Sequence, residues 1–450
     1  TGVQTCALPI YSISGLSANQ VKALATDKLD ALSSAQIKVL STAQMAALSA
    51  TQVGALTTDS AEVGVLSSAQ ISAMANTSVS GLSAAQLGNL NSSQLQALTT
   101  GQVRALSATQ LDALTTAQID SLSTKQINTL TASQVSALTS AGNTGEVAKL
   151  TTAQIQAISA SAVTGLTSDQ IKVMDSAQIQ SLTTAQVKVL STDQMTALTS
   201  VQMNKLTSQQ MSVLTASQFT ALVANTTEMK TLSTDQIRGL SNSVLTSIAS
   251  TNLQVMTTDQ IQALSTSQVK ALTSAQITNL TTGQVKALTT AQVSVLSATQ
   301  IAAIETEDLV KLGTDQIASL SKSMVTALTT AQTANLTAAQ LGALTSSQVQ
   351  GLSATQLKAL TTAQISKIGS AQISALSAAQ ISAIESQDVA NLTGDQVSSL
   401  TATQVRALSS SQLIAMTSDQ ISKIGTQQIS VFNAAQLSAL QTEDLAQLTE

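Results

Sequence analysis

The sequence predicts an all-α solenoid of very short capped helices, with one helix per octapeptide. Leucine recurs every eight residues, as at Leu16, Leu24 and Leu32. Each leucine usually precedes a Ser or Thr, and these residues favour the N-cap of a helix. A Gln usually follows that Ser or Thr by three residues, which is the spacing of a capping box. A short repeat that carries its own helix-start signals is typical of a helical repeat protein.

The repeat covers nearly the whole chain. We number each octad from its leucine, so that the consensus Leu-[Ser/Thr]-x-x-Gln-[Ile/Val/Leu/Met]-x-Ala fills positions 1 to 8. The chain holds 53 octads between Leu16 and Leu448, and Gln fills position 5 in 41 of them. Longer, irregular octads lie near residues 56–66, 138–150 and 222–232. Residues 12–450 are therefore expected to form a single continuous octapeptide-repeat solenoid.

One octad illustrates the helix signals. Ser33 and Gln36 have the spacing of a capping box, and Leu32 and Ile37 have the spacing of a hydrophobic staple. Across the array, Asp favours position 4 and Lys or Arg favours position 7, which suits the helix dipole. A single uninterrupted helix is disfavoured, because eight residues at 100° each overshoot two turns by about 80° and would spiral the leucines around the surface. Each helix should therefore end before the next Ser or Thr.

A β-solenoid is the alternative fold. An even repeat length and many Val, Ile and Thr residues suit strands. The corners of a β-solenoid favour Gly, Asn or Asp, and 18 Gly residues across 53 octads are too few to supply them. In a strand, side chains alternate between two faces, so Gln at position 5 would share one face with Leu at position 1 while Ile at position 6 would lie on the other face. These points favour helices.

The packing follows from the size of the repeat. One octad buries too little apolar surface to offset the entropy of ordering eight residues, so stability must come from stacked neighbours. Positions 1, 6 and 8 should form the apolar spine, and positions 3, 4 and 7 should face water. Lysines sixteen residues apart, such as Lys270 and Lys286, suggest that two octads complete one coil.

A longer period is superimposed on the octads. Octads without Gln begin at Met74, Ile158, Leu240 and Leu320, at intervals of ten octads. The acidic octads at Ile304 and Ile384 follow the same interval. This pattern indicates duplication of ten-octad blocks; the alternative is that ten octads form one superhelical turn or one partner site.

The composition excludes most chemistry. The chain has no His and one Cys, and charged residues make up 10% of it. It therefore lacks an imidazole base, a His or Cys metal cluster and a disulfide. Glu305, Glu307 and Asp308 cluster, as do Glu443 and Asp444, but they lie where the first turn of a helix favours acids. We expect a protein that is not an enzyme, with no catalytic, cofactor-binding or metal-binding residues and no cofactor.

Charge and aromatic content also limit the partners. A net charge of −5 and an aromatic content of 1% oppose nucleic-acid binding. Membrane insertion is not expected, because each octad interrupts the apolar residues with Ser, Thr or Gln. A protein or cell-surface partner remains open.

The first eleven residues do not follow the repeat. Residues 1–10 read TGVQTCALPI and hold the only Pro and the only Cys. This string resembles the translation of a short-read sequencing adapter, so residues 1–11 are expected to be a non-native or disordered leader.

Octads such as LTTAQIQAI and LSTAQMAAL resemble the octapeptide-repeat tracts of very large bacterial surface and secreted proteins, which carry adhesin or haem-utilisation and adhesion labels. The resemblance spans residues 12–450 and implies an extracellular or cell-surface location in a bacterium. It implies a structural role as an elongated stalk or adhesive passenger. The alternative role is a solenoid scaffold that binds a protein or peptide. No functional residue is carried over by this resemblance.

The last octads keep their apolar spine at Leu437, Leu440, Leu445 and Leu448. Terminal repeats of a solenoid normally carry a polar outer face. We therefore expect this chain to be a fragment of a longer array, whose end coils fray or associate end to end.

Overall fold

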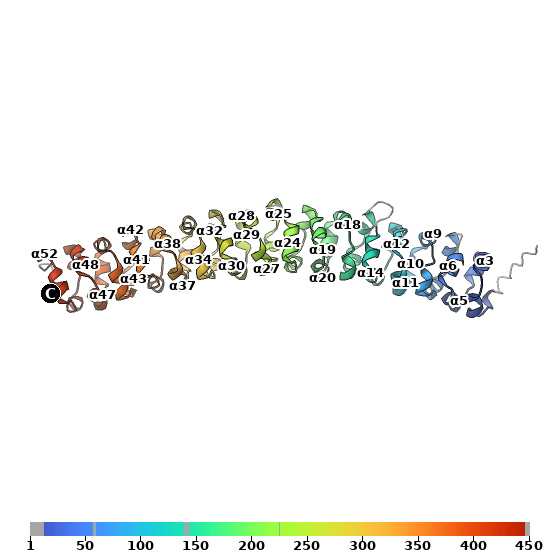
Figure 1. Ribbon diagram of the computed structural model, residues 1–450, viewed down its shortest axis with the longest axis horizontal. Coiled ribbons are helices and arrows are strands. Elements are labelled where there is room, and N and C mark those ends of the chain that lie inside the picture. Colours follow the sequence, from blue (N-terminus) through green and yellow to red (C-terminus); the bar gives the residue numbers. More distant parts are fainter. Residues whose placement is uncertain (1–12, 57–59, 139–143, 225, 446–450) are drawn as a thin grey trace, which may run out of the picture. The chain divides into compact units, whose positions relative to one another are not determined.

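The fold is all-α, as the sequence predicts. A computed structural model describes residues 13–56, 60–138, 144–224 and 226–445, and every element in these ranges is a helix. The β-solenoid alternative is wrong, since the described residues form no strand. The chain divides into two compact units, Thr1–Ala224 and Asn225–Glu450. In Figure 1 the helices of the first unit run from blue to green, and those of the second from yellow-green to red.

The described helices of the first unit are α2 (Ala18–Lys22), α3 (Thr26–Asp30), α4 (Ser34–Lys38), α5 (Thr42–Ala47), α6 (Ala50–Leu56), η1 (Ser60–Val65), α7 (Ser68–Ala73), α8 (Asn76–Val79), α9 (Ala84–Gly88), α10 (Ser92–Ala97), α11 (Thr100–Ala105), α12 (Ala108–Asp112), α13 (Thr116–Asp120), α14 (Thr124–Asn128), α15 (Ala132–Ser136), η3 (Thr144–Lys149), α16 (Thr152–Ala157), α17 (Ala160–Val163), α18 (Ser168–Val173), α19 (Ser176–Ser181), α20 (Thr184–Lys188), α21 (Thr192–Thr196), α22 (Ser200–Met203), α23 (Ser208–Ser212) and α24 (Ala216–Leu222).

Those of the second unit are α25 (Thr226–Thr231), α26 (Thr234–Gly239), α27 (Asn242–Ser247), α28 (Ser250–Gln254), α29 (Thr258–Ala263), α30 (Thr266–Ala271), α31 (Ser274–Thr278), α32 (Thr282–Ala287), α33 (Thr290–Ser294), α34 (Ala298–Ala303), α35 (Thr306–Leu309), α36 (Thr314–Ala318), α37 (Lys322–Ala327), α38 (Thr330–Asn335), α39 (Ala338–Gly342), α40 (Ser346–Val349), α41 (Ala354–Lys358), α42 (Thr362–Ile365), α43 (Ser370–Ala375), α44 (Ala378–Ala383), α45 (Ser386–Val389), α46 (Gly394–Ser398), α47 (Ala402–Arg406), α48 (Ser410–Ala415), α49 (Ser418–Ile421), α50 (Thr426–Ile429), α51 (Ala434–Ala439) and α52 (Thr442–Leu445).

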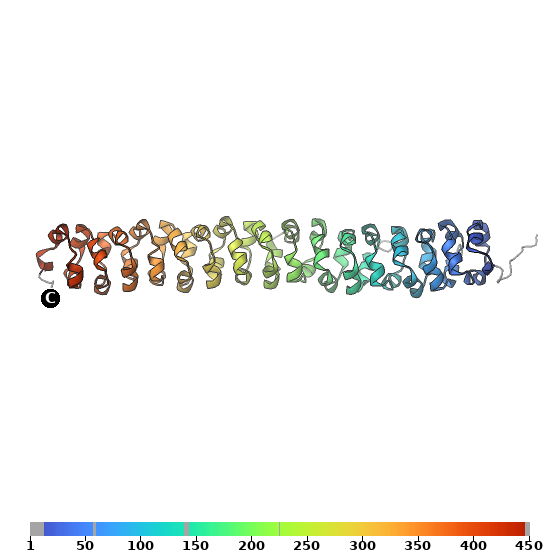
Figure 2. The ribbon, with the colours of Figure 1, turned by 90° about the horizontal axis from the view of Figure 1, so that it is seen from below.

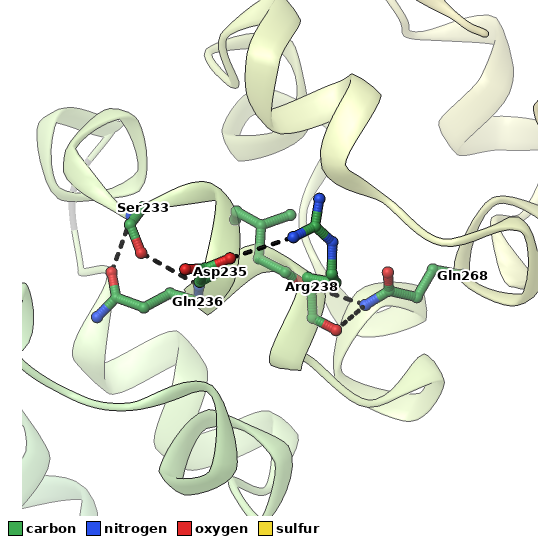
Figure 3. A network of polar contacts seen from close by, with 6 residues as sticks. Ser233, Asp235, Gln236, Arg238 and Gln268 are labelled. Carbon is green, nitrogen blue, oxygen red and sulfur yellow. Dashed lines mark hydrogen bonds and ion pairs between the residues drawn. The ribbon is translucent and has the colours of Figure 1, made fainter.

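Each regular octad forms one helix, and the N-terminus of most of these helices carries the predicted capping box. Figure 3 shows this at the start of α26, where the Gln236 backbone N–H donates to Ser233 Oγ at 3.2 Å. In return, the Ser233 backbone N–H donates to Gln236 Oε1 at 2.8 Å. The Ser233 backbone is extended, with φ −70° and ψ 159°, so the chain turns between helices at the cap itself. The helices therefore break at each octad without needing a glycine at their ends.

Three octads complete one coil. Within each unit a helix packs against the third helix before it and the third helix after it, so that α29 contacts α26 and α32. A series of helices related in this way is called a column below. The stacked coils can be followed in Figure 2. The expectation of two octads per coil is wrong, because lysines sixteen residues apart lie in different columns.

The core lies inside the coils and is lined by positions 1, 5 and 6. Val269 at position 6 is fully buried, and Leu264 at position 1 and Gln268 at position 5 are each 3% exposed. Positions 4 and 7 are mostly exposed, as expected. Position 8 is different from the prediction, since most of its alanines are only half-buried. Glutamine at position 5, and not alanine at position 8, completes the core with positions 1 and 6.

The irregular octads keep the helical pattern where the structure describes them. The first holds the 3₁₀ helix η1, the second holds the 3₁₀ helix η3, and the third holds α25. Residues 1–11, predicted to be a leader, lie outside the described residues.

Candidate functional site

The position-5 glutamines form a seam of hydrogen bonds between successive coils. Gln268 Nε2 donates to the backbone carbonyls of Leu240 at 2.8 Å and Ile237 at 3.1 Å. It also lies 3.2 Å from the Arg238 carbonyl, as Figure 3 shows. Meanwhile Gln268 Oε1 accepts from the Ser265 backbone N–H at 2.7 Å. One amide therefore caps the N-terminus of its own helix and binds the C-terminal carbonyls of a helix in the preceding coil. We call these glutamines and their carbonyl partners the glutamine seam.

The glutamine seam keeps a constant register. In a regular octad the carbonyl acceptors lie 28 and 31 residues before the glutamine, as for Gln284 with Met256 and Leu253. Across the irregular octad 138–150 these separations become 32 and 35, as for Gln170 with Leu138 and Val135. The four extra residues are therefore accommodated within one octad, and the next glutamine still reaches the equivalent carbonyls.

The glutamine seam stabilises the packing of the coils by pairing main-chain polar groups. The last carbonyls of a helix have no intrahelical partner, and buried carbonyls are costly to leave unpaired. A carboxamide can accept at one end and donate twice at the other. Glutamine thus satisfies a main-chain donor and two or three main-chain acceptors from a site that is nearly closed to water.

Acids replace glutamine at position 5 in α35, α45 and α52. Asp308, Asp388 and Asp444 are all buried, with exposed fractions of 5% or less. The Thr362 hydroxyl donates to Asp388 Oδ1 at 2.8 Å, and the Ser418 hydroxyl donates to Asp444 Oδ1 at 2.9 Å. An ionised aspartate offers only acceptors, so it cannot donate to the preceding coil as glutamine does.

The environment of Asp388 disfavours its charge. Burial raises the pKa of Asp388 above its ordinary value of 3.8, and the negative charge of Glu385 raises it further. The hydrogen bond from Thr362 acts in the opposite direction and lowers the pKa, but the net shift is upward.

An open hollow adjoins the Asp388 octad. It has a volume of about 670 Å³, and its lining includes Lys358, Ser382, Glu385 and Ser409. A smaller hollow of about 320 Å³ lies beside α35 and is lined in part by Glu307 and Lys311. Each hollow therefore presents one acid and one base together with neutral groups.

The clustered acids of the sequence separate in the structure. Glu305 is the N-cap residue of α35, and Glu307 is exposed in its first turn, whereas Asp308 is buried at position 5. In α52, Glu443 is exposed and Asp444 is buried. Among the described residues no three His, Cys, Asp or Glu side chains gather as a metal site would require. The buried role of Asp388 was missed, although its place at the glutamine position could have indicated it.

Four of the octads with neither Gln nor an acid at position 5, those that begin at Met74, Ile158, Leu240 and Leu320, show how coils meet when the amide is missing. Ser78 fills position 5 of α8, and its hydroxyl donates to the Leu48 carbonyl at 2.5 Å. The backbones then approach so closely that a Cβ on Gly81 would lie 1.8 Å from the Ala50 carbonyl oxygen. Ala162 and Gly165 repeat this pair, with a distance of 1.9 Å to the Ala132 carbonyl. The residues at position 5 in the other two octads, Val244 and Met324, are buried as Ser78 and Ala162 are.

Helices that are ten octads apart do not lie on the same face of a unit. Ten octads make three and one-third coils, because a coil holds three octads. In the second unit, α35 belongs to the column that continues through α38, α41 and α44, whereas α45 belongs to the column of α39, α42 and α48. The two acidic octads therefore lie on different columns, which favours block duplication over a partner site repeated along one face.

The described residues contain no helix long and apolar enough to cross a membrane. The model of the ALTTAQ repeat family matches residues 21–58, 90–124, 108–140, 171–200, 245–282 and 301–338. These stretches are similar to the ALTTAQ repeat, and the matches support a repeat tract.

No curated protein matches the chain. Among solved structures, a homology model of the full-length AP-3 complex in an intermediate open conformation is 11% identical, with a TM-score of 0.20, over 95% of this chain and 80% of that chain. The structure of APUM23-GGAUUUGACGG is also 11% identical, with a TM-score of 0.18, over 98% of this chain and 94% of that chain. Both TM-scores are too low to support any argument.

Proposed function

We propose that the chain is a structural repeat segment that spaces or presents other domains at the surface of a bacterium, as a stalk or adhesive passenger, with no catalytic activity. The glutamine seam is the observation that supports this proposal. In the glutamine seam, the most regular polar side chain of the sequence joins each coil to the next. The amide groups of the repeat therefore bind main-chain groups of the same array and are not presented to a ligand. A chain selected to catalyse or to bind one small ligand would concentrate distinctive residues at one place.

The regular seam also suits a spacer. Because each coil repeats the same contacts, octads can be added or removed in threes without changing the local packing. The stability of each coil then depends only on its neighbouring coils. The number of coils, and with it the length of the array, can therefore vary without loss of stability.

The proposal is tested in bacteria that carry the gene. Antibodies against the octad array should label intact cells, and external protease should remove the label. A control antibody against a cytoplasmic protein should label lysed cells only. Labelling of the array that requires lysis would contradict a surface role.

A scaffold that binds a protein or peptide is the second candidate. The hollow beside Lys358 and Glu385 favours it, because this hollow combines opposite charges with several hydroxyl groups. Pull-down of surface components by the wild-type chain but not by the Lys358→Ala, Glu385→Ala variant would support this role. Equal capture by the variant would contradict it.

A further inference from the structure

The acidic octad that begins at Ile384 interrupts the glutamine seam inside the second unit. By the register of the regular octads, a glutamine at position 5 of α45 would donate to the carbonyls of Leu360 and Leu357. Asp388 stands there instead, and an ionised carboxylate has no hydrogen to donate. In the described part of the chain no other side-chain amide reaches the Leu360 carbonyl. The N-terminus of α45 therefore meets the C-terminus of α41 without the amide that links other coils.

The links on either side of α45 are complete. Gln380 of the preceding helix, α44, donates through Nε2 to the Leu352 carbonyl at 2.6 Å. Gln396 of the following helix, α46, donates through Nε2 to the Ile365 carbonyl at 3.1 Å. A separation of coils at Asp388 would therefore be confined to the contact of α45 with α41 and α42.

The hollow of about 670 Å³ lies at this interrupted link. Its lining includes Ala354, Thr355 and Lys358 from α41, and Ser386 and Gln387 from α45. These are the two helices that a glutamine at position 5 would have joined. The open space therefore lies where the amide link is missing, and it brings solvent close to the Asp388 octad.

The closed contact gives the Asp388 carboxylate little compensation for its burial. Its side chain is in a residue that is 1% exposed, and the Thr362 hydroxyl of α42 donates to it at 2.8 Å. None of the ion pairs that the described residues form includes Asp388. Burial, and then the charge of Glu385, raise the pKa of Asp388 above 3.8 despite the bond from Thr362. A buried carboxylate with so few partners either takes up a proton or regains water.

Few charged groups surround Asp388. Lys358 of α41, Lys367 after α42 and Asp395 of α46 are all exposed. Glu385 adds negative charge within the octad itself, whereas α44 and α48 carry no charged residue. Water and salt screen exposed charges. The balance between the two states of this contact therefore depends chiefly on the ionisation of Asp388.

We propose that the contact of α45 with α41 and α42 is a pH-sensitive joint, which opens when Asp388 is ionised and closes when Asp388 is protonated. In the open joint, water from the hollow reaches the carboxylate and the Leu360 carbonyl. In the closed joint, a protonated carboxyl group has a hydrogen to donate. The Ser78 hydroxyl shows that a short side chain at position 5 can reach the preceding coil, since it donates to the Leu48 carbonyl at 2.5 Å. This inference does not depend on where the chain functions.

The first experiment measures hydrogen exchange by mass spectrometry on the full 450-residue chain between about pH 4 and pH 8. Protection factors are compared, because they correct for the effect of pH on the chemical exchange rate. Residues 354–362 and 384–391 should lose protection as the pH rises from 3.8 towards the folded pKa, by about tenfold for each unit by which that pKa is raised. Residues 258–287, which carry intact glutamine links, serve as the reference and should keep theirs.

Variants assign the effect to Asp388. Asp388→Gln should make the protection of the joint independent of pH, and Asp395→Asn should leave its pH dependence as in the wild-type chain. Thr362→Val removes a hydrogen bond to the carboxylate, so it should enlarge the loss of protection between acid and neutral pH. A joint whose protection does not change with pH, an unchanged pH dependence in Asp388→Gln, or an equal loss of protection in the reference segment would each overturn the proposal.

The second experiment moves the joint to a regular octad. Gln284→Asp places an acid at position 5 of α32, where Thr258 of α29 occupies the position that Thr362 has in α42. Residues 250–258 and 282–287 should then lose protection as the pH rises, and the joint at Asp388 should behave as before. Protection that stays independent of pH at the new site would contradict the proposal, because a buried acid at position 5 would then not be sufficient to make a joint.

Discussion

Gln284 Nε2 donates to the Met256 carbonyl at 2.8 Å and so joins α32 to the coil before it. The same nitrogen donates to the Leu253 carbonyl at 2.8 Å, and Oε1 accepts from the Thr281 backbone N–H at 2.9 Å. The side chain is 2% exposed, so these bonds form away from water. A residue that looks like a helix cap in the sequence is therefore also the main polar link between coils.

The first prediction concerns this link. Gln284→Ala should lower the free energy of unfolding by about 1–3 kcal/mol, because it leaves buried carbonyls without donors. Gln284→Glu should cost more at neutral pH, since a carboxylate then faces carbonyl oxygens. The cost of Gln284→Glu should shrink as the pH falls, because a protonated carboxyl group regains a donor. Urea unfolding followed by far-UV circular dichroism measures both effects.

The control for Gln284 is Gln262, an exposed position-7 glutamine in α29. Gln262→Ala and Gln262→Glu should each change the free energy of unfolding by less than about 0.5 kcal/mol. Equal effects at the two sites would mean that the glutamine seam contributes little to stability.

The second prediction concerns pH and Asp388. Its pKa is raised in the folded chain, chiefly by burial, so the folded state binds its proton more tightly than the unfolded state does. The stability contributed by this group is therefore full below the ordinary pKa of 3.8 and is lost as the pH rises through the folded pKa. Asp388→Gln should raise the free energy of unfolding at neutral pH by about 0.5–1.5 kcal/mol and should lose this advantage in acid.

Two comparisons make the Asp388 prediction specific. Asp388→Asn removes the charge but keeps the short side chain, so it should flatten the pH dependence even if it fails to restore the seam. Asp395→Asn changes an exposed position-4 aspartate in the next helix, α46, and should leave the pH dependence nearly as it is. Matching pH profiles for the wild-type chain and Asp388→Asn would refute the assignment.

The third prediction concerns the close approach of two coils at Gly81. A Cβ there would lie 1.8 Å from the Ala50 carbonyl oxygen, which is backbone and cannot move aside cheaply. Gly81→Ala should therefore destabilise the chain by about 1–3 kcal/mol. Gly88→Ala is the control, because the nearest atom to its Cβ would be the Ala113 carbonyl oxygen at 3.9 Å. Gly88 ends a helix, and alanine there should be neutral or stabilise the chain by up to about 1 kcal/mol. Thermal unfolding compares the two variants, and equal shifts would show that the approach is looser than described.

The sequence was sufficient to predict the short helices but not the coil. Ser233 and Gln236 can be read as a capping box because both partners are side chains at a fixed spacing. The second role of the glutamines has no such signal, because the acceptors are main-chain carbonyls and any residue can supply them. Lys270 and Lys286 suggested two octads per coil, yet both are exposed in the helices α30 and α32, which do not pack together. Their spacing reflects the octad and not the coil.

Burial at position 8 was overestimated for a related reason. Alanine is apolar and small, so it was expected in the spine, but the glutamines at position 5 line the core and most of these alanines are half-buried. Its burial is possible only because every polar atom of the amide finds a partner, as in Gln268. The buried position-5 acids could have been found by asking which residues replace glutamine, since Asp308, Asp388 and Asp444 all occupy that position.

The last prediction concerns the irregular octad between Leu138 and Leu150. The separation from Gln154 to its Leu122 acceptor is 32 residues, against 28 from Gln134 to Leu106 before the irregular octad. The four extra residues therefore do not change which carbonyls the next glutamines reach. Deleting four residues from within 139–143 should restore a regular octad and leave the helical signal and the free energy of unfolding nearly unchanged, because the later glutamines keep the same carbonyl acceptors. Deleting residues 283–286 instead removes Gln284 and shifts every later octad by half a repeat against the preceding coil, so it should destabilise the second unit strongly. Circular dichroism and urea unfolding of the two deletions test this, and equal damage from both would show that the irregular octad is needed for packing.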